Sequence, residues 1–132
     1  MNKPKILKQL EKGNINDSNL FIEKLFENDV VENDIYEADI DGSKFSNINF
    51  QEKNITFISA VDSVFENCVF TNLEITEYFS RCEFINCKII GLKINKLKRM
   101  DNVLFKDCDM KVLGLSDIML ENVTFDNCNL EN

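Results

Sequence analysis

The chain has 132 residues, of which 44% are hydrophobic, and its 23 acidic and 15 basic residues give a formal net charge of −8. This composition fits one folded domain and excludes a disordered chain. The acidic balance argues against direct nucleic-acid binding, because phosphate contacts need a basic surface. No apolar run is long enough to span a membrane and the first residues lack a signal-peptide pattern, so we expect a cytoplasmic protein with reduced cysteines.

The N-terminal segment has a helical pattern. Ile6, Leu7 and Leu10 are at helical spacing, and Gly13 follows as a stop signal. We therefore expect residues 1–12 to form a short helix that caps the domain of residues 13–132. Residues 17–27 fit either an amphipathic helix or a first repeat, and similarity of the segment at Leu25 to later segments favours the repeat.

From residue 15 onward, apolar residues recur at every fifth position, with one residue lost before Phe79 and one gained before Met100. A period of five fits neither a helix nor a flat strand. It predicts a chain that turns a corner after each short extended segment. All five cysteines lie two positions before such a centre, which supports the register independently.

A longer period combines four of these units. Similar segments start 20, 20, 19, 21 and 20 residues apart, at Leu25, Phe45, Phe65, Phe84, Phe105 and Phe125. A repeat of this length is typical of solenoid proteins. The sequence therefore predicts six large units, each made of four short ones.

Individual units, such as Ala38 to Gly42 and Ser18 to Leu20, follow a pattern of a small residue, Asp or Asn, a large apolar residue and polar residues. In this the chain resembles the pentapeptide-repeat family over residues 13–132. The resemblance implies an all-β fold, a right-handed quadrilateral parallel β-helix solenoid of about six coils. Charged residues depart from the pattern at the small, inward position, namely Glu23, Lys53, Glu77 and Lys98.

In such a solenoid, the centres should stack in four interior columns. These columns are Ile15, Ile35, Ile55, Ile75, Ile94 and Leu115; Leu20, Ile40, Ala60, Phe79, Met100 and Leu120; Leu25, Phe45, Phe65, Phe84, Phe105 and Phe125; and Val30, Phe50, Phe70, Ile89, Met110 and Leu130. A ladder of Asn28, Ile48, Cys68, Cys87, Cys108 and Cys128 should run beside the last column. The final coil should leave an apolar end and an unpaired β edge, which a homodimer through the C-terminal coil would cover, as occurs in the family.

The residue types give little support to catalysis. Without histidine, no Cys-His or Ser-His pair can form. The four glycines are scattered rather than gathered in a phosphate-binding loop. Stacked cysteines would lie in a line rather than around a metal ion. We therefore expect no catalytic residue, cofactor or metal, and we interpret the basic run from Lys93 to Arg99 as a solvated loop.

Outward positions of the early coils combine acids with aromatic residues. The candidate partner-binding residues are Asp34, Tyr36, Glu37, Asp39, Asp41, Phe57, Asp62, Glu74, Glu77 and Tyr78. Exposed aromatic side chains provide anchor area, and charge steers association. An acidic protein must also place its acidic residues on its surface without any partner. This explanation of the pattern has the same weight as partner binding.

These features predict a non-catalytic solenoid that occludes a protein partner, for example a toxin-immunity or self-protection protein. The family resemblance implies an alternative, because its fluoroquinolone-resistance members are duplex-DNA mimics that bind DNA gyrase and topoisomerase IV. The shortness of the predicted rod and the basic run from Lys93 to Arg99 count against this alternative.

Overall fold

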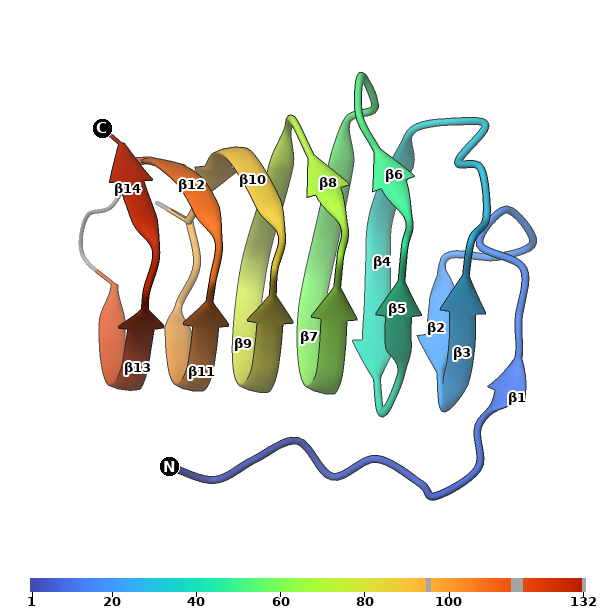
Figure 1. The fold of residues 1–132 in the computed structure, drawn as a ribbon, viewed down its shortest axis with the longest axis horizontal. Coiled ribbons are helices and arrows are strands. Elements are labelled where there is room, and N and C mark those ends of the chain that lie inside the picture. The colour runs from blue at the N-terminus through green and yellow to red at the C-terminus, as the bar shows by residue number, and fades with distance from the viewer. Residues whose placement is uncertain (95, 115–117, 132) are drawn as a thin grey trace.

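The computed structural model describes residues 1–94, 96–114 and 118–131, and these form a parallel β-solenoid (Figure 1). Its strands belong to one 14-stranded sheet, and the pairings between them are parallel. The chain winds through about five turns. The predicted all-β solenoid is confirmed, because each segment of the repeat pairs with its counterpart one turn away.

The strands are β1 (Glu11–Lys12), β2 (Leu20–Ile22), β3 (Lys24–Glu27), β4 (Ile35–Asp41), β5 (Lys44–Ser46), β6 (Asn49–Phe50), β7 (Ile55–Glu66), β8 (Val69–Phe70), β9 (Leu73–Ile85), β10 (Lys88–Lys93), β11 (Arg99–Lys106), β12 (Asp109–Leu113), β13 (Met119–Asp126) and β14 (Asn129–Glu131). The strand β7 pairs with both β4 and β5 on the preceding turn, because it runs around a corner of the tube. Among the described residues, no helix is long and apolar enough to cross a membrane.

A stack of phenylalanine rings fills the interior. The centroids of Phe45 and Phe65 are 4.6 Å apart, those of Phe65 and Phe84 4.5 Å, and those of Phe84 and Phe105 5.1 Å. Phe125 continues the stack at 5.0 Å from Phe105. The predicted phenylalanine column is therefore confirmed from the second coil onward.

Two corners of each winding have left-handed backbone. At one of them φ lies between 51° and 56°, and the residues there are Asn28, Asn47, Asn67, Asn86, Asp107 and Asn127. Asparagine and aspartate tolerate this conformation better than other residues with a side chain. Neighbouring corner side chains also bond to one another, for example the Asn86 amide to Oδ1 of Asn67 at 2.6 Å. The asparagine pattern thus determines where the chain bends.

The cysteines point into the tube next to these corners, as predicted. The thiol of Cys87 donates to the carbonyl oxygens of Phe65 and Ile85, both at 3.4 Å, and Cys108 repeats the arrangement one turn later. Each of the five cysteines is a free thiol. Burial raises the pKa of Cys82 to about 12, so this thiol stays protonated and unreactive.

The first winding differs from the prediction by one residue. Phe21 pairs with Ile40 and Phe26 with Phe45, so these two phenylalanines are the inward centres in place of the predicted Leu20 and Leu25. Likewise Val31 is buried, whereas the predicted centre Val30 is exposed. Each error involves two adjacent apolar residues, and spacing alone does not decide which of them faces inward.

The predicted ladder that begins with Asn28 and Ile48 is also displaced by one residue in this winding. Because Phe26 is the centre of this unit, Asp29 and not Asn28 stands under Ile48, and Asn28 occupies the corner. The predicted count of six coils is not confirmed, since this winding contributes only short strands and the isolated bridge from Val30 to Asn49.

A second correction concerns Phe57, which was expected on the surface but is fully buried. Alternate side chains of an extended strand share a face, so Ile55 and Phe57 of β7 both point inward. On the next turn Leu73 pairs with Ile55, and Ile75 pairs with Phe57. The predicted column of Ile55 above Ile75 is therefore displaced by two residues. Leu115, the last member of that column, lies outside the described residues.

The predicted N-terminal helix is not confirmed. Residues 1–10 are extended and lie along one side of the solenoid (Figure 1), and β1 then pairs with β3. Gly13 is not a helix stop: a Cβ atom there would lie 2.6 Å from the Phe26 ring, so only glycine allows the chain to approach so closely. Docking against the solenoid replaces the local helical preference of this segment.

The stack of rings leads to a stability prediction. Phe65→Ala should destabilise the fold by about 3–5 kcal/mol, because a cavity opens between two packed rings. Phe125→Ala should cost about 1 kcal/mol, since this ring is already 43% exposed. Urea unfolding monitored by circular dichroism measures both. Equal losses in the two variants would contradict the central role of the stack.

Candidate functional site

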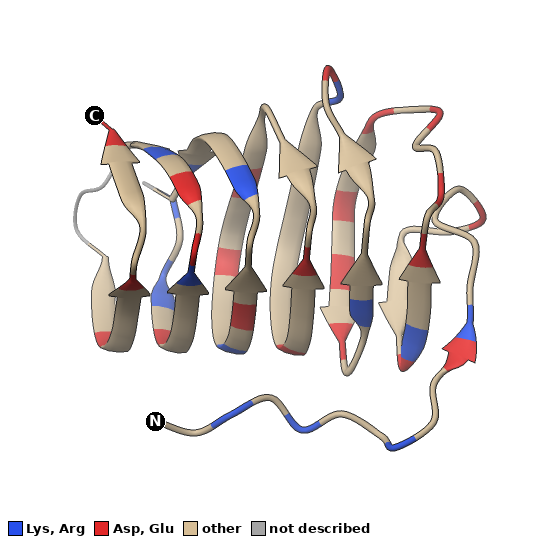
Figure 2. Ribbon diagram, in the orientation of Figure 1, with Lys and Arg blue, Asp and Glu red and all other residues tan. Residues whose placement is uncertain are grey.

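One face of the solenoid, formed by β2, β4 and parts of β7, β9, β11 and β13, carries two outward rows along the tube axis. Strand register defines the first row as Leu20, Asp39, Ser59, Tyr78, Arg99 and Met119. It defines the second as Ile22, Asp41, Val61, Ser80, Asp101 and Glu121. Figure 2 shows that acidic residues are prominent along β4. The predicted candidate residues are thus spread over rows rather than gathered in one pocket.

A compact cluster lies at the start of β4. The Tyr36 hydroxyl donates to Oδ2 of Asp34 at 2.9 Å, and the Asn54 backbone N–H donates to Oδ1 of the same carboxylate at 2.9 Å. These two bonds lower the pKa of Asp34, while the Asp34 carboxylate raises the pKa of Tyr36. Tyr36 remains 58% exposed, so a fixed aromatic ring projects from the surface beside exposed Glu37.

The first row continues this surface along the tube. Asp39 is half-buried and accepts a hydrogen bond from Ser59 at 3.3 Å. Tyr78 follows Ser59 in the row, and Arg99 follows Tyr78. Arg99 donates to Glu121 at 2.7 Å. Asp39 on β4 is therefore the one acidic residue of this row, and the row becomes basic at Arg99 on β11.

At the corner that follows the second row, Asp62 has several partners. Arg81 binds the carboxylate through two hydrogen bonds of 2.7 and 3.0 Å, and the Lys5 backbone N–H donates to it at 3.1 Å. Partial burial raises the pKa of Asp62, but these hydrogen bonds outweigh burial and leave the pKa lowered. For nearby Asp41, burial and the charges of Asp62 and Glu23 raise the pKa.

Two of the three glutamates of β9, Glu74 and Glu77, are predicted candidates and precede Tyr78 on that strand. Glu77 is exposed and forms an ion pair with Lys98 at 2.9 Å, and this contact raises the pKa of Lys98. Glu74 is half-buried between Thr56 and Lys93 in the strand register. Of the predicted set, the structure thus brings together Asp34, Tyr36 and Glu37 at the start of β4. Strand register connects Asp39 to Tyr78 through Ser59, whereas Glu74 and Glu77 are not paired with other candidates. Phe57 is buried and so is not part of the surface.

Sequence reasoning missed four polar residues beside this face: Ser80, Arg81, Asp101 and Asn102. Ser80 and Asp101 are buried although their row faces outward, and Asn102 accepts a hydrogen bond from the Asn2 backbone N–H at 3.1 Å. The contact of Asn102 depends on the extended path of residues 1–10. The helix predicted for residues 1–12 would not follow that path. The lysines of this segment are the one sequence feature that is consistent with an acidic surface beside it.

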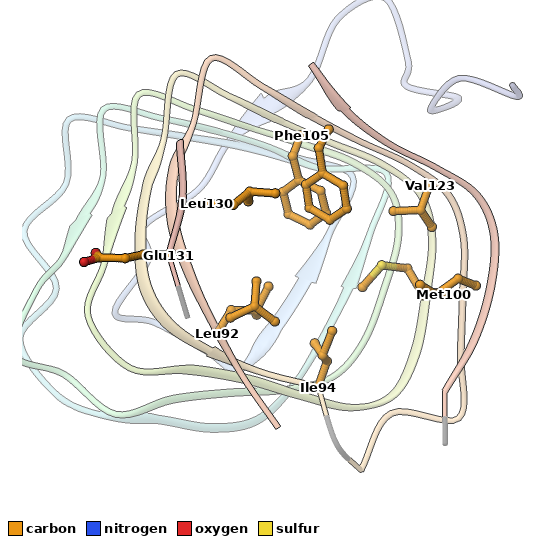
Figure 3. A pocket seen from close by; sticks show the side chains of 10 residues that line it. Leu92, Ile94, Met100, Phe105, Val123, Leu130 and Glu131 are labelled. Atoms are coloured by element: carbon orange, nitrogen blue, oxygen red, sulfur yellow. The ribbon is translucent and has the colours of Figure 1, made fainter. Parts of the chain in front are cut away.

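The C-terminal end of the tube contains an apolar cavity of about 170 Å³. Figure 3 shows Leu92, Ile94, Met100 and Leu130 pointing into it, whereas Glu131 points away from the tube. Apolar side chains around this end are partly exposed, including Leu120 at 48% and Leu130 at 52%. The predicted apolar end of the solenoid is therefore present.

Within the described ranges, no group of three or more His, Cys, Asp and Glu residues is arranged to hold a metal ion. Comparison of the chain with protein-family models and with curated proteins gives no match. The arrangement of the surface is therefore the basis for any functional proposal.

The Tyr36 cluster leads to a titration prediction. In a Tyr78→Phe background, the tyrosinate absorbance of Tyr36 should appear at a pH above its ordinary pKa of 10.0. Asp34→Ala should lower this pKa towards 10.0, because it removes both the acceptor and the negative charge. Any stability from the bond is present below the unfolded pKa and is lost as the pH rises through the folded pKa. An unchanged pKa in Asp34→Ala would contradict the bond.

Proposed function

We propose that this chain is a pentapeptide-repeat protein that acts without catalysis, by occluding a protein partner with the outward face of β4. The Tyr36 cluster is the observation that supports this proposal most directly. Hydrogen bonding to Asp34 restrains an exposed aromatic ring, so that little side-chain entropy is lost when a partner packs against it. Tyrosines are enriched among the residues that dominate binding energy at protein interfaces.

The charges around Tyr36 indicate a basic partner. Glu37 and Asp41 are exposed and Asp39 is half-buried on the same strand, β4. A group of acidic side chains on one strand accelerates association with a positively charged surface. A toxin-immunity or self-protection protein is one form of such a function, in which a rigid cytoplasmic chain covers the active surface of its target. The buried free thiols agree with a reducing compartment.

A duplex-DNA mimic that binds DNA gyrase or topoisomerase IV is supported less well. Mimicry of a phosphate backbone needs a continuous row of negative charge. Here Arg81 follows Asp62 at the corner, and Arg99 follows Tyr78 in the first row. Two of the predicted acids, Asp62 and Glu77, are also neutralised by ion pairs.

Photo-crosslinking tests the proposed face. A benzophenone amino acid at position 36 should capture a specific protein in the source cells, whereas the same group at exposed Lys88 on β10 should not. Tyr36→Ala should then weaken binding of the purified partner at least tenfold, and Lys88→Ala should leave it unchanged. Equal binding by both variants would exclude the β4 face, and gyrase inhibition in a supercoiling assay would favour the DNA mimic.

We also propose that the apolar C-terminal end binds a second copy of this chain. A two-fold axis perpendicular to the tube would place the outer edges of β13 and β14 against their own copies in antiparallel orientation. This pairing would satisfy edge N–H and C=O groups, and it would cover Leu120, Phe125 and Leu130, which are each more than 40% exposed.

Sedimentation velocity tests the dimer. The wild-type chain should sediment as a dimer at micromolar concentration, and Leu120→Glu should be monomeric, because a buried glutamate would lack a partner at the interface. Leu20→Glu is the matched control, since Leu20 is 57% exposed on β2 at the other end. A monomeric wild type, or equal dissociation of both variants, would refute the proposal.

A further inference from the structure

Residues 1–10, here called the strap, lie on the solenoid with few attachments. The structure gives two hydrogen bonds that hold this segment, from the backbone N–H of Asn2 to Oδ1 of Asn102 and from that of Lys5 to Oδ1 of Asp62. Strand pairing begins only at Glu11. Most strap side chains are exposed, and only Pro4, Ile6 and Leu10 are half-buried. Segments with so few buried contacts open most easily from a native structure.

The strap crosses the windings at a fixed place. Asp62, Arg81 and Asn102 occupy the same corner on three successive turns. Two steps between windings span about 9.6 Å, and the three residues from Asn2 to Lys5 span about 10 Å when extended. The backbone of residues 2–5 therefore crosses the intervening turn, whose residue at this corner is Arg81. Figure 1 shows the N-terminal segment running across the windings.

Two buried polar atoms next to this crossing have no hydrogen-bond partner among the described atoms. In the second outward row, Ile22, Asp41 and Glu121 are exposed, whereas Ser80 is 0% and Asp101 8% exposed. The hydroxyl of Ser80 and Oδ1 of Asp101 have no hydrogen-bond partner among the described atoms. Buried polar groups without a partner are costly. Ser80 and Asp101 directly precede Arg81 and Asn102, the corner residues that the strap crosses, and no strap atom bonds to either of them. The strap is therefore an incomplete ligand for this surface.

Charge complements the geometry. The strap carries Lys3, Lys5 and Lys8, seen as the basic positions near the N-terminus in Figure 2. Beside the crossing, the carboxylate of Asp62 pairs with Arg81 and that of Asp101 pairs with Arg99 through Oδ2 at 3.5 Å. Asp41 and Glu23 add further negative charge close to Asp62. The charge of Lys5 itself helps to lower the pKa of Asp62.

We infer that the corner of Asp62, Arg81 and Asn102, together with Ser80 and Asp101, is a docking surface for an extended lysine-bearing segment of a partner protein, and that the strap occupies this docking surface until the partner displaces it. The partner segment binds as the strap does, by donating backbone N–H groups to Asp62 and Asn102. In addition it supplies donors to Ser80 and Asp101. This inference rests on the proposed function only for the existence of a partner, because displacement of the strap can be measured without one.

The test uses the full chain and a synthetic peptide of residues 1–12, acetylated and amidated at its ends. Asn2→Pro with Lys5→Pro removes both strap donors, because proline has no backbone N–H. Titration of this double variant with the peptide, followed by NMR, should shift the amide signals of Asp62, Arg81 and Asn102 in a saturable way. Wild-type protein should bind the peptide at least tenfold more weakly, because its own strap competes at a high effective concentration.

Two controls isolate the hydrogen bonds and the charge. Lys3→Pro introduces a proline into the strap at a position for which the structure gives no hydrogen bond, so it should behave like wild type. A peptide with glutamine in place of its lysines should bind the double variant more weakly, and increasingly so at low salt, where charge attraction is strongest.

Several results would overturn the inference. One is the absence of saturable shifts in the double variant while its spectrum remains that of the folded solenoid. Another is equal affinity of the peptide for wild type and double variant. Because the assay does not involve the β4 face, the docking-surface proposal can fail while the Tyr36 proposal stands. Conversely, loss of crosslinking at position 36 leaves the peptide result unaffected.

Discussion

The structure depends on the match between the spacing of parallel strands and the distance between the centroids of offset-stacked aromatic rings. Neighbouring strands of a sheet lie about 4.8 Å apart, and the rings from Phe45 to Phe125 are 4.5 to 5.1 Å apart. Each winding therefore contributes one ring to a continuous stack without leaving a void. A shift of one residue would turn these side chains outward, so the stack requires that every winding return to the same register.

Insertions and deletions are consequently confined to places where the stack is not interrupted. Two residues are lost in the turn between Phe70 and Leu73, and a bulge between Ile75 and Tyr78 restores one of them. Two residues are added between Lys93 and Arg99, which return the following phenylalanine to its column. The winding length varies, but the pairing of Phe65 with Phe84 and of Phe84 with Phe105 is maintained.

This constraint explains which parts of the fold could be predicted. The phenylalanine column and the inward cysteines follow from residues that recur once per winding, so many windings support the same register. The first winding could not be placed as well, because Leu20 and Phe21, or Leu25 and Phe26, are equally apolar and only pairing with the next turn selects between them. The position of Phe57 was predicted wrongly for a related reason. The strand β7 has no left-handed corner between Ile55 and Asp62, so Phe57 follows Ile55 on the same inward face. The N-terminal segment was misread because its contacts are with residues up to 100 positions away.

The candidate surface could be predicted only where its contacts are local in the sequence. Tyr36 and Asp34 are two residues apart in the sequence and meet through a local bond, whereas the pair of Asp62 and Arg81 spans a full winding. The backbone suggests that the charges of that pair are not incidental. Glu23, Asp62 and Arg81 have φ values of 50°, 50° and 48°, while Gly42, Asn102 and Asn122 occupy the same corner on other turns. A left-handed conformation costs about 1 kcal/mol or more for residues with longer side chains. Glycine or asparagine in place of Glu23 and Arg81 would avoid part of that cost. The chain instead has charged side chains at this corner, where Asp62 pairs with Arg81 and accepts a hydrogen bond from the Lys5 backbone N–H. The backbone cost at Glu23 and Arg81 is therefore accompanied by an electrostatic surface, which is the surface that we propose for docking.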